Sequence, residues 1–240
     1  MRRISRVAPL LLAFAALFAG ACGAVSGSSR TATPTPVPAT ATPEPLDLTV
    51  FRGFIYPIKG ACLPSADQLM PNAPRVYRGG VHEGVDFYDY DNCAKIGKGT
   101  AIVAAKDGVV IRADHDYKPL TPAQLSAADN RIAAGQANDP DVIDLFRGRQ
   151  VWIDHGKGIV TRYAHTSDVA ANIRVGDRVK QGDIIAFVGD SGTPESLTSP
   201  GTEEHLHFEL RTGDTFLGNG LPAADVRTLY KRLFTPLDAP

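Results

Sequence analysis

The sequence has few cysteines and methionines and almost no excess of charge. Its 240 residues include three cysteines, two methionines and one tryptophan, and the formal net charge is −1. This balance lacks the polybasic footprint of a nucleic-acid binder, so we expect no nucleic-acid partner. The cysteines form no close pair, which argues against a cysteine-rich zinc site. The apolar run at residues 7–21 is too short to span a bilayer.

Residues 1–22 have the layout of a secretory signal, with arginines before an apolar core. The segment ends in LFAGACG at residues 17–23, and small residues before a cysteine resemble a bacterial lipoprotein signal. An ordinary signal peptide cleaved nearby is the alternative. We favour lipidation of Cys22. The protein is then expected to be exported to the cell envelope and lipid-anchored at the outer face of the cytoplasmic membrane, with no other membrane contact.

Residues 23–47 are rich in Thr, Pro, Ser and Ala. Such a segment cannot bury a core, so we predict a disordered linker that serves as a stalk or as a passive spacer. Residues 48–240 are long enough for one domain with a full core, which we expect to be monomeric. With Cys22 assigned to the lipid, Cys62 and Cys93 remain as a pair in an exported chain, and we predict a disulfide between them.

The domain is predicted to be mainly β, as an antiparallel sheet or sandwich with a substrate groove. Short apolar runs such as AIVA (101–104) and IIAFV (184–188) alternate with glycine turns. Residues 113–148 differ, because TPAQ at 121–124 has the form of a helix-capping box. We predict a helical insertion there. It could form a wall of the active cleft or cap a sheet edge, and the pattern slightly favours the cap.

The chemistry centres on HLHFEL, residues 205–210. In a strand, Leu206, Phe208 and Leu210 point to one face, while the two histidines and Glu209 point to the other. Two imidazoles on one rigid face can begin a divalent metal site, although surface histidines on an edge strand are the alternative. Glu209 could orient a histidine ligand, but a solvent-facing carboxylate is favoured.

A second cluster, HEGVD, occupies residues 82–86. In extended backbone His82, Gly84 and Asp86 share a face, and the glycine is expected to leave room for an ion or a substrate chain. An ordinary turn is the alternative. His82, Asp86 and one downstream histidine would make three protein ligands, the number that a catalytic zinc site uses.

HEGVD, RYAHT (162–166) and HLHFEL, in this order, resemble the signature of the lysostaphin-like, or LytM-type, zinc endopeptidases of bacterial peptidoglycan. The resemblance extends over residues 56–211. It implies that His82, Asp86 and His207 bind Zn²⁺, and that His165 and His205 are catalytic without binding metal. It further implies an antiparallel β fold with a groove, and peptidoglycan peptides as substrate. Thr166 and Glu204 depart from the usual family pattern.

Two other functions are consistent with parts of the sequence. An inactive relative could bind wall peptide or activate another hydrolase, but such relatives usually lose a ligand or catalytic histidine. VGDRVKQGDIIAFVG (175–189) resembles half of a lipoyl or biotinyl carrier, for which Lys106 is a weak attachment candidate. Of the remaining histidines, His155 is predicted to be structural and His115 to be solvated.

Overall fold

The computed structural model describes residues 50–76 and 79–236. The chain divides after Pro45, and these residues belong to the second unit, Leu46–Pro240. The predicted signal (1–22), Cys22 and the predicted linker (23–47) lie outside the described residues. No helix in the described part of the chain has the length and apolar character needed to cross a membrane.

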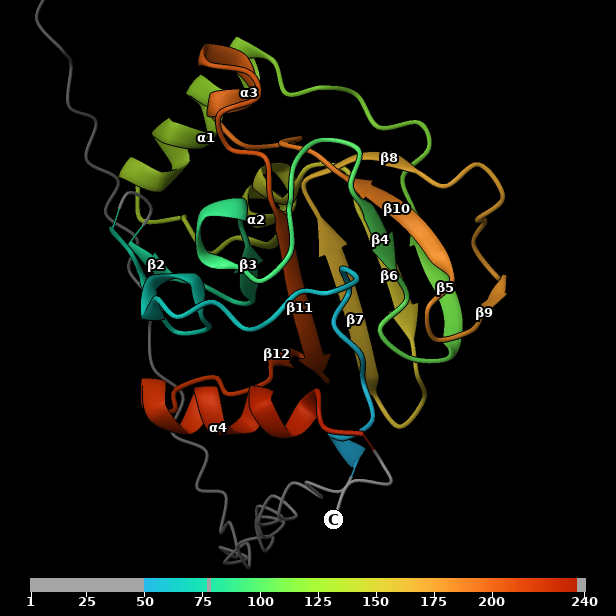
Figure 1. The fold of residues 1–240 in the computed structure, drawn as a ribbon. Coiled ribbons are helices and arrows are strands. Elements are labelled where there is room, and N and C mark those ends of the chain that lie inside the picture. Colours follow the sequence, from blue (N-terminus) through green and yellow to red (C-terminus); the bar gives the residue numbers. More distant parts are fainter. Residues whose placement is uncertain (1–49, 77–78, 237–240) are drawn as a thin grey trace, which may run out of the picture. The chain divides into compact units, whose positions relative to one another are not determined.

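Two antiparallel sheets form the centre of the domain (Figure 1). The larger has the order β12-β11-β7-β6-β5-β9, with β3 also paired to β11. Its strands are β3 (Val85–Phe87), β5 (Gly108–Ala113), β6 (Val151–Asp154), β7 (Ile159–Ala164), β9 (Arg178–Val179), β11 (Leu206–Thr212) and β12 (Thr215–Phe216). The smaller has the order β4-β10-β8, from β4 (Ala101–Val103), β8 (Thr166–Val169) and β10 (Ile184–Val188). The antiparallel β prediction is confirmed.

The core contains the apolar face of β11. Leu206, Phe208 and Leu210 are fully buried in one cluster with Ile102 of β4 and Ile185 of β10, so side chains of both sheets meet there. Because side chains alternate along a strand, this packing turns His207 and Glu209 to the opposite face of β11. The apolar half of HLHFEL therefore fixes the direction of its polar half.

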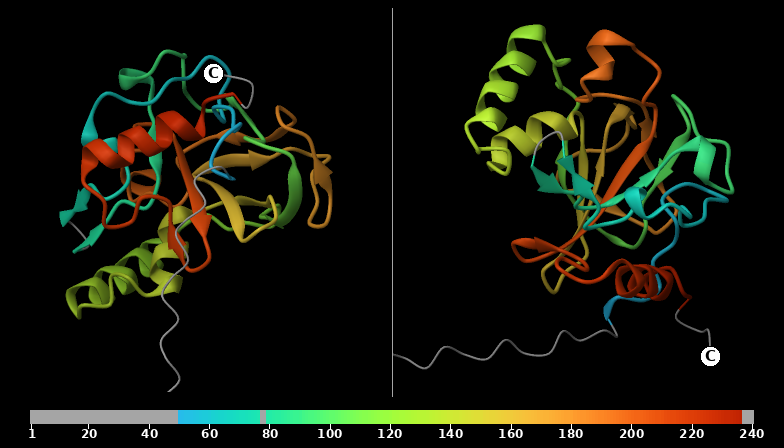
Figure 2. Two further views of the ribbon diagram at one scale, coloured as in Figure 1. Left: turned by 90° about the horizontal axis from the view of Figure 1, so that it is seen from below. Right: turned by 90° about the vertical axis from the view of Figure 1, so that its left-hand side faces the viewer.

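The predicted insertion is helical and lies beside the strands of the larger sheet (Figure 2). It contains α1 (Pro122–Ala133) and α2 (Pro140–Arg147). Thr121 and Gln124 form the predicted capping box, which satisfies backbone donors at the start of α1. Gly148 directly follows α2, and its φ of 66° suits glycine. The remaining elements are η2 (Asp67–Leu69), β1 (Pro74–Arg75), β2 (Gly80–Val81), η4 (Asp89–Asp91), α3 (Glu195–Thr198) and α4 (Ala223–Leu233).

Cys62 and Cys93 are joined by a disulfide with an S–S distance of 2.09 Å and a sequence separation of 31. In the chain-entropy model, closing a loop of this length contributes about 3–4 kcal/mol to the free energy of unfolding. The closed loop contains HEGVD. Asn92 strengthens the same junction, because its side chain accepts from the Cys62 N–H and donates to the Cys62 carbonyl.

Candidate metal centre and active site

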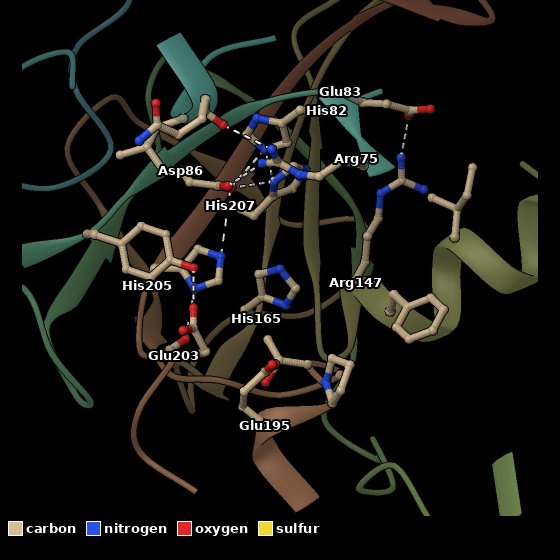
Figure 3. Close-up of a pocket in the computed structure, with 18 of the residues that line it drawn as sticks. Arg75, His82, Glu83, Asp86, Arg147, His165, Glu195, Glu203, His205 and His207 are labelled. Carbon is tan, nitrogen blue, oxygen red and sulfur yellow. Dashed lines mark hydrogen bonds and ion pairs between the residues drawn. The ribbon is translucent and has the colours of Figure 1, made fainter. Parts of the chain in front are cut away.

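Strand pairing brings the HEGVD and HLHFEL motifs together. Antiparallel pairing of β3 with β11 places Asp86 directly opposite His207, and directly opposed side chains in a sheet are close neighbours. His82 precedes β3, and its backbone N–H and C=O are bonded to Ala73 and Asn72. Three side chains from two distant segments thus reach the same point, as Figure 3 shows.

The three candidate ligand atoms form a small triangle. His82 Nε2 lies 3.0 Å from His207 Nδ1 and 2.9 Å from Asp86 Oδ1, and His207 Nδ1 lies 2.8 Å from Asp86 Oδ1. Ligand atoms around a tetrahedral zinc ion are about 3.3 Å apart, given bond lengths of about 2.0–2.2 Å. The side chains would need to separate by only a few tenths of an ångström to hold such an ion.

The other ring nitrogens of the two histidines are already hydrogen-bonded. His82 Nδ1 donates to the Met70 carbonyl at 3.1 Å, and His207 Nε2 donates to Glu209 Oε1 at 3.0 Å. In the neutral rings these bonds assign the proton to the outer nitrogen and leave a lone pair directed at Asp86. Histidine ligands of metals are held in this way by carbonyl or carboxylate acceptors. The donor set therefore fits zinc.

The electrostatics of the cluster favour a positive charge at its centre. Burial lowers the pKa of His207, but hydrogen bonds to Asp86 and Glu209 outweigh burial and raise it to about 9. Burial would raise the pKa of Asp86, yet His82 and His207 hold it well below its usual value. Burial lowers the pKa of His82 to about 4, so this ring is neutral at pH 7. Arg75 pairs with the second oxygen of Asp86 at 2.9 Å.

His165 and His205 lie where the chain passes between the two sheets. His165 joins β7 of the larger sheet to β8 of the smaller, and its φ of 59° is unusual for a residue with a side chain. His205 directly precedes β11 and is bonded through its backbone to Gly189, just after β10. The centroids of the two rings are 4.5 Å apart, beside the ligand cluster in Figure 3.

In both of these imidazoles Nδ1 is bonded to a backbone carbonyl, and Nε2 lies on the other side of the ring. His165 Nδ1 donates to the Ser191 carbonyl at 2.9 Å, and His205 Nδ1 donates to the Glu203 carbonyl at 2.8 Å. Burial lowers the pKa of both rings, and for His165 the neighbouring imidazoles lower it further. Each therefore has an unprotonated Nε2 at neutral pH, and that of His205 is 3.7 Å from Asp86 Oδ1. These groups can accept a proton.

A groove of about 790 Å³ contains all five of these side chains. The insertion contributes a wall through Leu125 and Ile132 of α1 and through Ile143 and Phe146 of α2. The favoured interpretation of the insertion as a simple cap on a sheet edge is therefore wrong. Because the two helices form a hairpin, their apolar side chains can face the groove together.

Sequence comparison identifies the family. The profile of Peptidase family M23 matches residues 80–219, which is more than half of the chain and includes all three motifs. The chain belongs to peptidase family M23. The LytM-type membership predicted from the sequence is confirmed.

The chain is similar to several known proteins. Over 116 residues the M23 chain is 34% identical to the cell division protein DipM of Caulobacter vibrioides, a match that covers 48% of this chain and 16% of DipM. A zinc-containing peptidase from Vibrio cholerae is 22% identical, with 71% of this chain and 41% of that one covered and a TM-score of 0.44. The catalytic domain of the M23 protein EnpA from Enterococcus faecalis is also 22% identical, with coverages of 70% and 94% and a TM-score of 0.42.

The two departures from the M23 pattern have local structural partners. Thr166 is fully buried, and its backbone N–H and hydroxyl both donate to the Arg149 carbonyl, so the hydroxyl is not left unpaired. The Glu204 carboxylate accepts a hydrogen bond from the Lys98 backbone at 2.8 Å. Both residues therefore fasten loops around the site and leave its ligands in place.

Three expectations about individual residues were wrong. Glu209 does not face solvent but is 0% exposed and accepts from His207. Gly84 does not leave room for an ion, because a Cβ there would lie 2.4 Å from the Phe208 carbonyl oxygen; it allows the chain to pack against β11. His115 is half-buried and its Nε2 is bonded to the Ile173 carbonyl at 2.6 Å. Charge pairing and close packing with distant segments explain these differences.

Sequence reasoning also missed an aromatic support for His205. The Tyr88 ring stacks on His205 at a centroid distance of 4.1 Å, and its hydroxyl donates to the Glu203 carboxylate at 2.6 Å. Glu203 thus restrains both rings, since its carbonyl accepts from His205. One signal was available: Tyr88 follows Asp86 by two residues, which in extended backbone places both on one face.

Proposed function

We propose that this M23 chain is an exported zinc metalloendopeptidase that hydrolyses peptide bonds of bacterial peptidoglycan. One observation carries the proposal. Ring nitrogens of His82 and His207 and a carboxylate oxygen of Asp86 converge within 3.0 Å, and the other nitrogen of each ring is bonded elsewhere. A divalent cation in place of the proton that His207 shares with Asp86 would be bound by all three atoms at once.

His82, Asp86 and His207 would hold the metal. Zinc in such a site supplies Lewis-acid chemistry that lowers the pKa of water from 15.7 to about 7. Three protein ligands leave a coordination position for water or substrate, as in catalytic rather than structural zinc sites. Glu209 and the Met70 carbonyl orient the two imidazole ligands, so the protein supplies a pre-organised set of donors.

His165 and His205 would provide proton transfer and hydrogen bonding. An unprotonated Nε2 can take the proton of the attacking water, and the resulting N–H can then donate to the tetrahedral oxyanion or to the leaving amine. The Ser191 and Glu203 carbonyls fix the direction of each ring. Tyr88 further restrains His205 by stacking, so that Nε2 stays directed at the cluster.

The groove and the family support a peptide substrate. The groove is lined by the insertion, by the segment that contains Arg75 and Val76, and by the histidines. A groove with two walls accommodates an extended chain better than a closed pocket would. Membership of family M23 and the likeness to a cell division protein support peptidoglycan as the source of that chain.

Chelation tests the proposed function directly. We expect the purified protein to solubilise peptidoglycan, a chelator to abolish this activity, and Zn²⁺ to restore it. Mg²⁺ should not restore activity, because a site with two imidazoles prefers zinc to a hard cation that favours oxygen ligands. Release of soluble muropeptides and mass analysis of the products measure the reaction and identify the bond.

The controls separate activity from binding. Protein that sediments with peptidoglycan but releases no muropeptide in the presence of zinc would show that the chain is an inactive wall binder. Hydrolysis that survives exhaustive chelation would contradict a metal-dependent reaction. Either result would reject the proposed enzyme.

The proposed location rests on the N-terminal sequence. In this proposal residues 1–22 direct export, lipidated Cys22 anchors the protein at the outer face of the cytoplasmic membrane, and residues 23–47 link the anchor to a monomeric peptidase domain at 48–240. We expect the mature protein to begin at Cys22 and to carry the added mass of acyl chains. Intact mass spectrometry measures this, and an unmodified N-terminus after cleavage would contradict the anchor.

A further inference from the structure

The helical insertion ends in a buried arginine that contacts two carboxylates next to the proposed metal ligands. Arg147, the last residue of α2, is 8% exposed. Its Nε donates to Glu209 Oε1 at 2.6 Å, and a terminal nitrogen donates to Glu83 Oε2 at 2.7 Å. The Glu83 contact is visible in Figure 3. One guanidinium therefore joins the carboxylate of Glu209 in β11 to that of Glu83 in the segment between β2 and β3.

Each of these carboxylates is adjacent to a proposed metal ligand. Glu209 Oε1, which accepts from Arg147, also accepts from His207 Nε2 at 3.0 Å. Glu83 directly follows His82 in the sequence. The planar guanidinium has several donors in a fixed fork and can hold both carboxylates at once. Arg147 is therefore placed to hold the His207 side chain and the His82 backbone in one arrangement.

Arg211 shares part of this contact, because it also donates to Glu83 Oε2. At Glu209, however, Arg162 and Arg211 approach only the other carboxylate oxygen, Oε2, at 3.6 and 3.4 Å. Glu209 Oε1 is thus shared by Arg147 and His207, whereas Oε2 faces the other two cations. Without Arg147, the carboxylate would be free to rotate towards Arg162 and Arg211 and to release His207.

We propose that Arg147 is a positioning residue through which the insertion sets the metal affinity of the site. This inference rests on the proposed function, because it assumes that His82, Asp86 and His207 bind zinc. Arg147 acts through Glu209 and Glu83 and does not touch the ligand triangle. The insertion then has a second role besides lining the groove: its docking keeps the outer nitrogen of His207 bonded.

Metal affinity of the folded protein tests the inference. Zn²⁺ binding is measured by competition with a chromogenic chelator for the unmodified protein and for R147M, R147K and R131M. We expect R147M to bind Zn²⁺ about 10–100-fold more weakly, the usual effect of removing a group that orients a ligand. R147K should lose about 3–10-fold, because an ammonium cannot hold both carboxylates in the fork geometry.

R131M is the matched control. Arg131 lies in the same insertion and pairs with Asp139 and Asp141, away from Glu209, so its loss should leave the affinity unchanged. Circular dichroism and the melting temperature of each metal-free variant show whether it is folded. If R147M fails to fold, the Zn²⁺ affinity of R147K tests the inference instead.

Unchanged Zn²⁺ affinity in folded R147M would overturn the inference. If R147M is unfolded, unchanged Zn²⁺ affinity in R147K would do so. An equal loss of affinity in R131M would also overturn it. Failure of the proposed function is distinguishable, because the unmodified protein itself would then not bind zinc.

Discussion

Replacing His207 with alanine is expected to abolish metal binding and to lower peptidoglycan hydrolysis by on the order of 10³-fold or more. His207 supplies one corner of the donor triangle and lies directly opposite Asp86 in the sheet. Two remaining ligands would hold the ion weakly, and water would regain a pKa far above neutrality. Metal content after dialysis and the rate of muropeptide release measure the two effects.

The matched control for this variant is His115→Ala. His115 lies in the part of the insertion before α1 and bonds the Ile173 carbonyl, outside the groove lining. Its loss should leave metal content and hydrolysis close to those of the unmodified protein. A His207→Ala protein that remains folded and retains both zinc and activity would show that the ligand assignment is wrong.

The second large effect concerns His165 and His205. Alanine at either position is expected to lower kcat by about 10²–10⁴-fold, the usual contribution of a positioned proton donor or acceptor. Zinc should stay bound at one ion per chain, because neither ring belongs to the donor triangle. The KM for a peptide substrate should change little, since these imidazoles act on the reacting atoms. Steady-state kinetics and metal analysis of the same preparations test both statements.

The combination of results distinguishes catalysts from ligands. If His165→Ala or His205→Ala loses zinc together with activity, the residue binds metal and the proposed division of roles is wrong. If both variants keep full kcat, proton transfer must come from another group of the groove. Folding is checked by the melting temperature, because His165 also holds an unusual backbone conformation at the junction of β7 and β8.

The location of the two catalytic candidates has a structural reason. Inside a sheet, a strand is hydrogen-bonded to a neighbouring strand on each side, which restricts its position. A side chain that must approach a reacting atom is therefore more easily placed where the strand pairing changes. His165 and His205 both occupy such points, at the passages from β7 to β8 and from β10 to β11. Two of the three proposed metal ligands, Asp86 and His207, instead lie in paired strands, where the register fixes their separation, and His82 precedes β3. Rigid strands thus suit the ligands, and the junctions suit the groups that transfer protons.

Some of the site could be read from short stretches of sequence, because local backbone geometry was sufficient. The alternation of HLHFEL predicted that Leu206 and Phe208 enter the core while His207 faces away, and both features are observed. The helix start at residue 121 followed from its capping residues, which interact over three positions.

The burial of the Glu209 carboxylate could not be predicted from the local sequence. Glu209 looks like a solvent-facing residue in its own strand, although His207 and Arg211, each two positions away, both contact its carboxylate. Its partner Arg147 is 62 residues away and belongs to an insertion whose docking depends on the whole sheet. A carboxylate is buried only when cations and donors accompany it. Whether this condition is met depends on the tertiary structure and not on the local sequence.

The sequence alone determined the family, the antiparallel β class and the chemical types of the site residues, because these depend on residue identity and on periods of two or four positions. Tertiary structure decided that Asp86 opposes His207, that the insertion lines the groove, and that Arg147 and Glu209 support a histidine. Each of these depends on contacts between segments that are distant in the chain, and such contacts form only when the sheets are assembled.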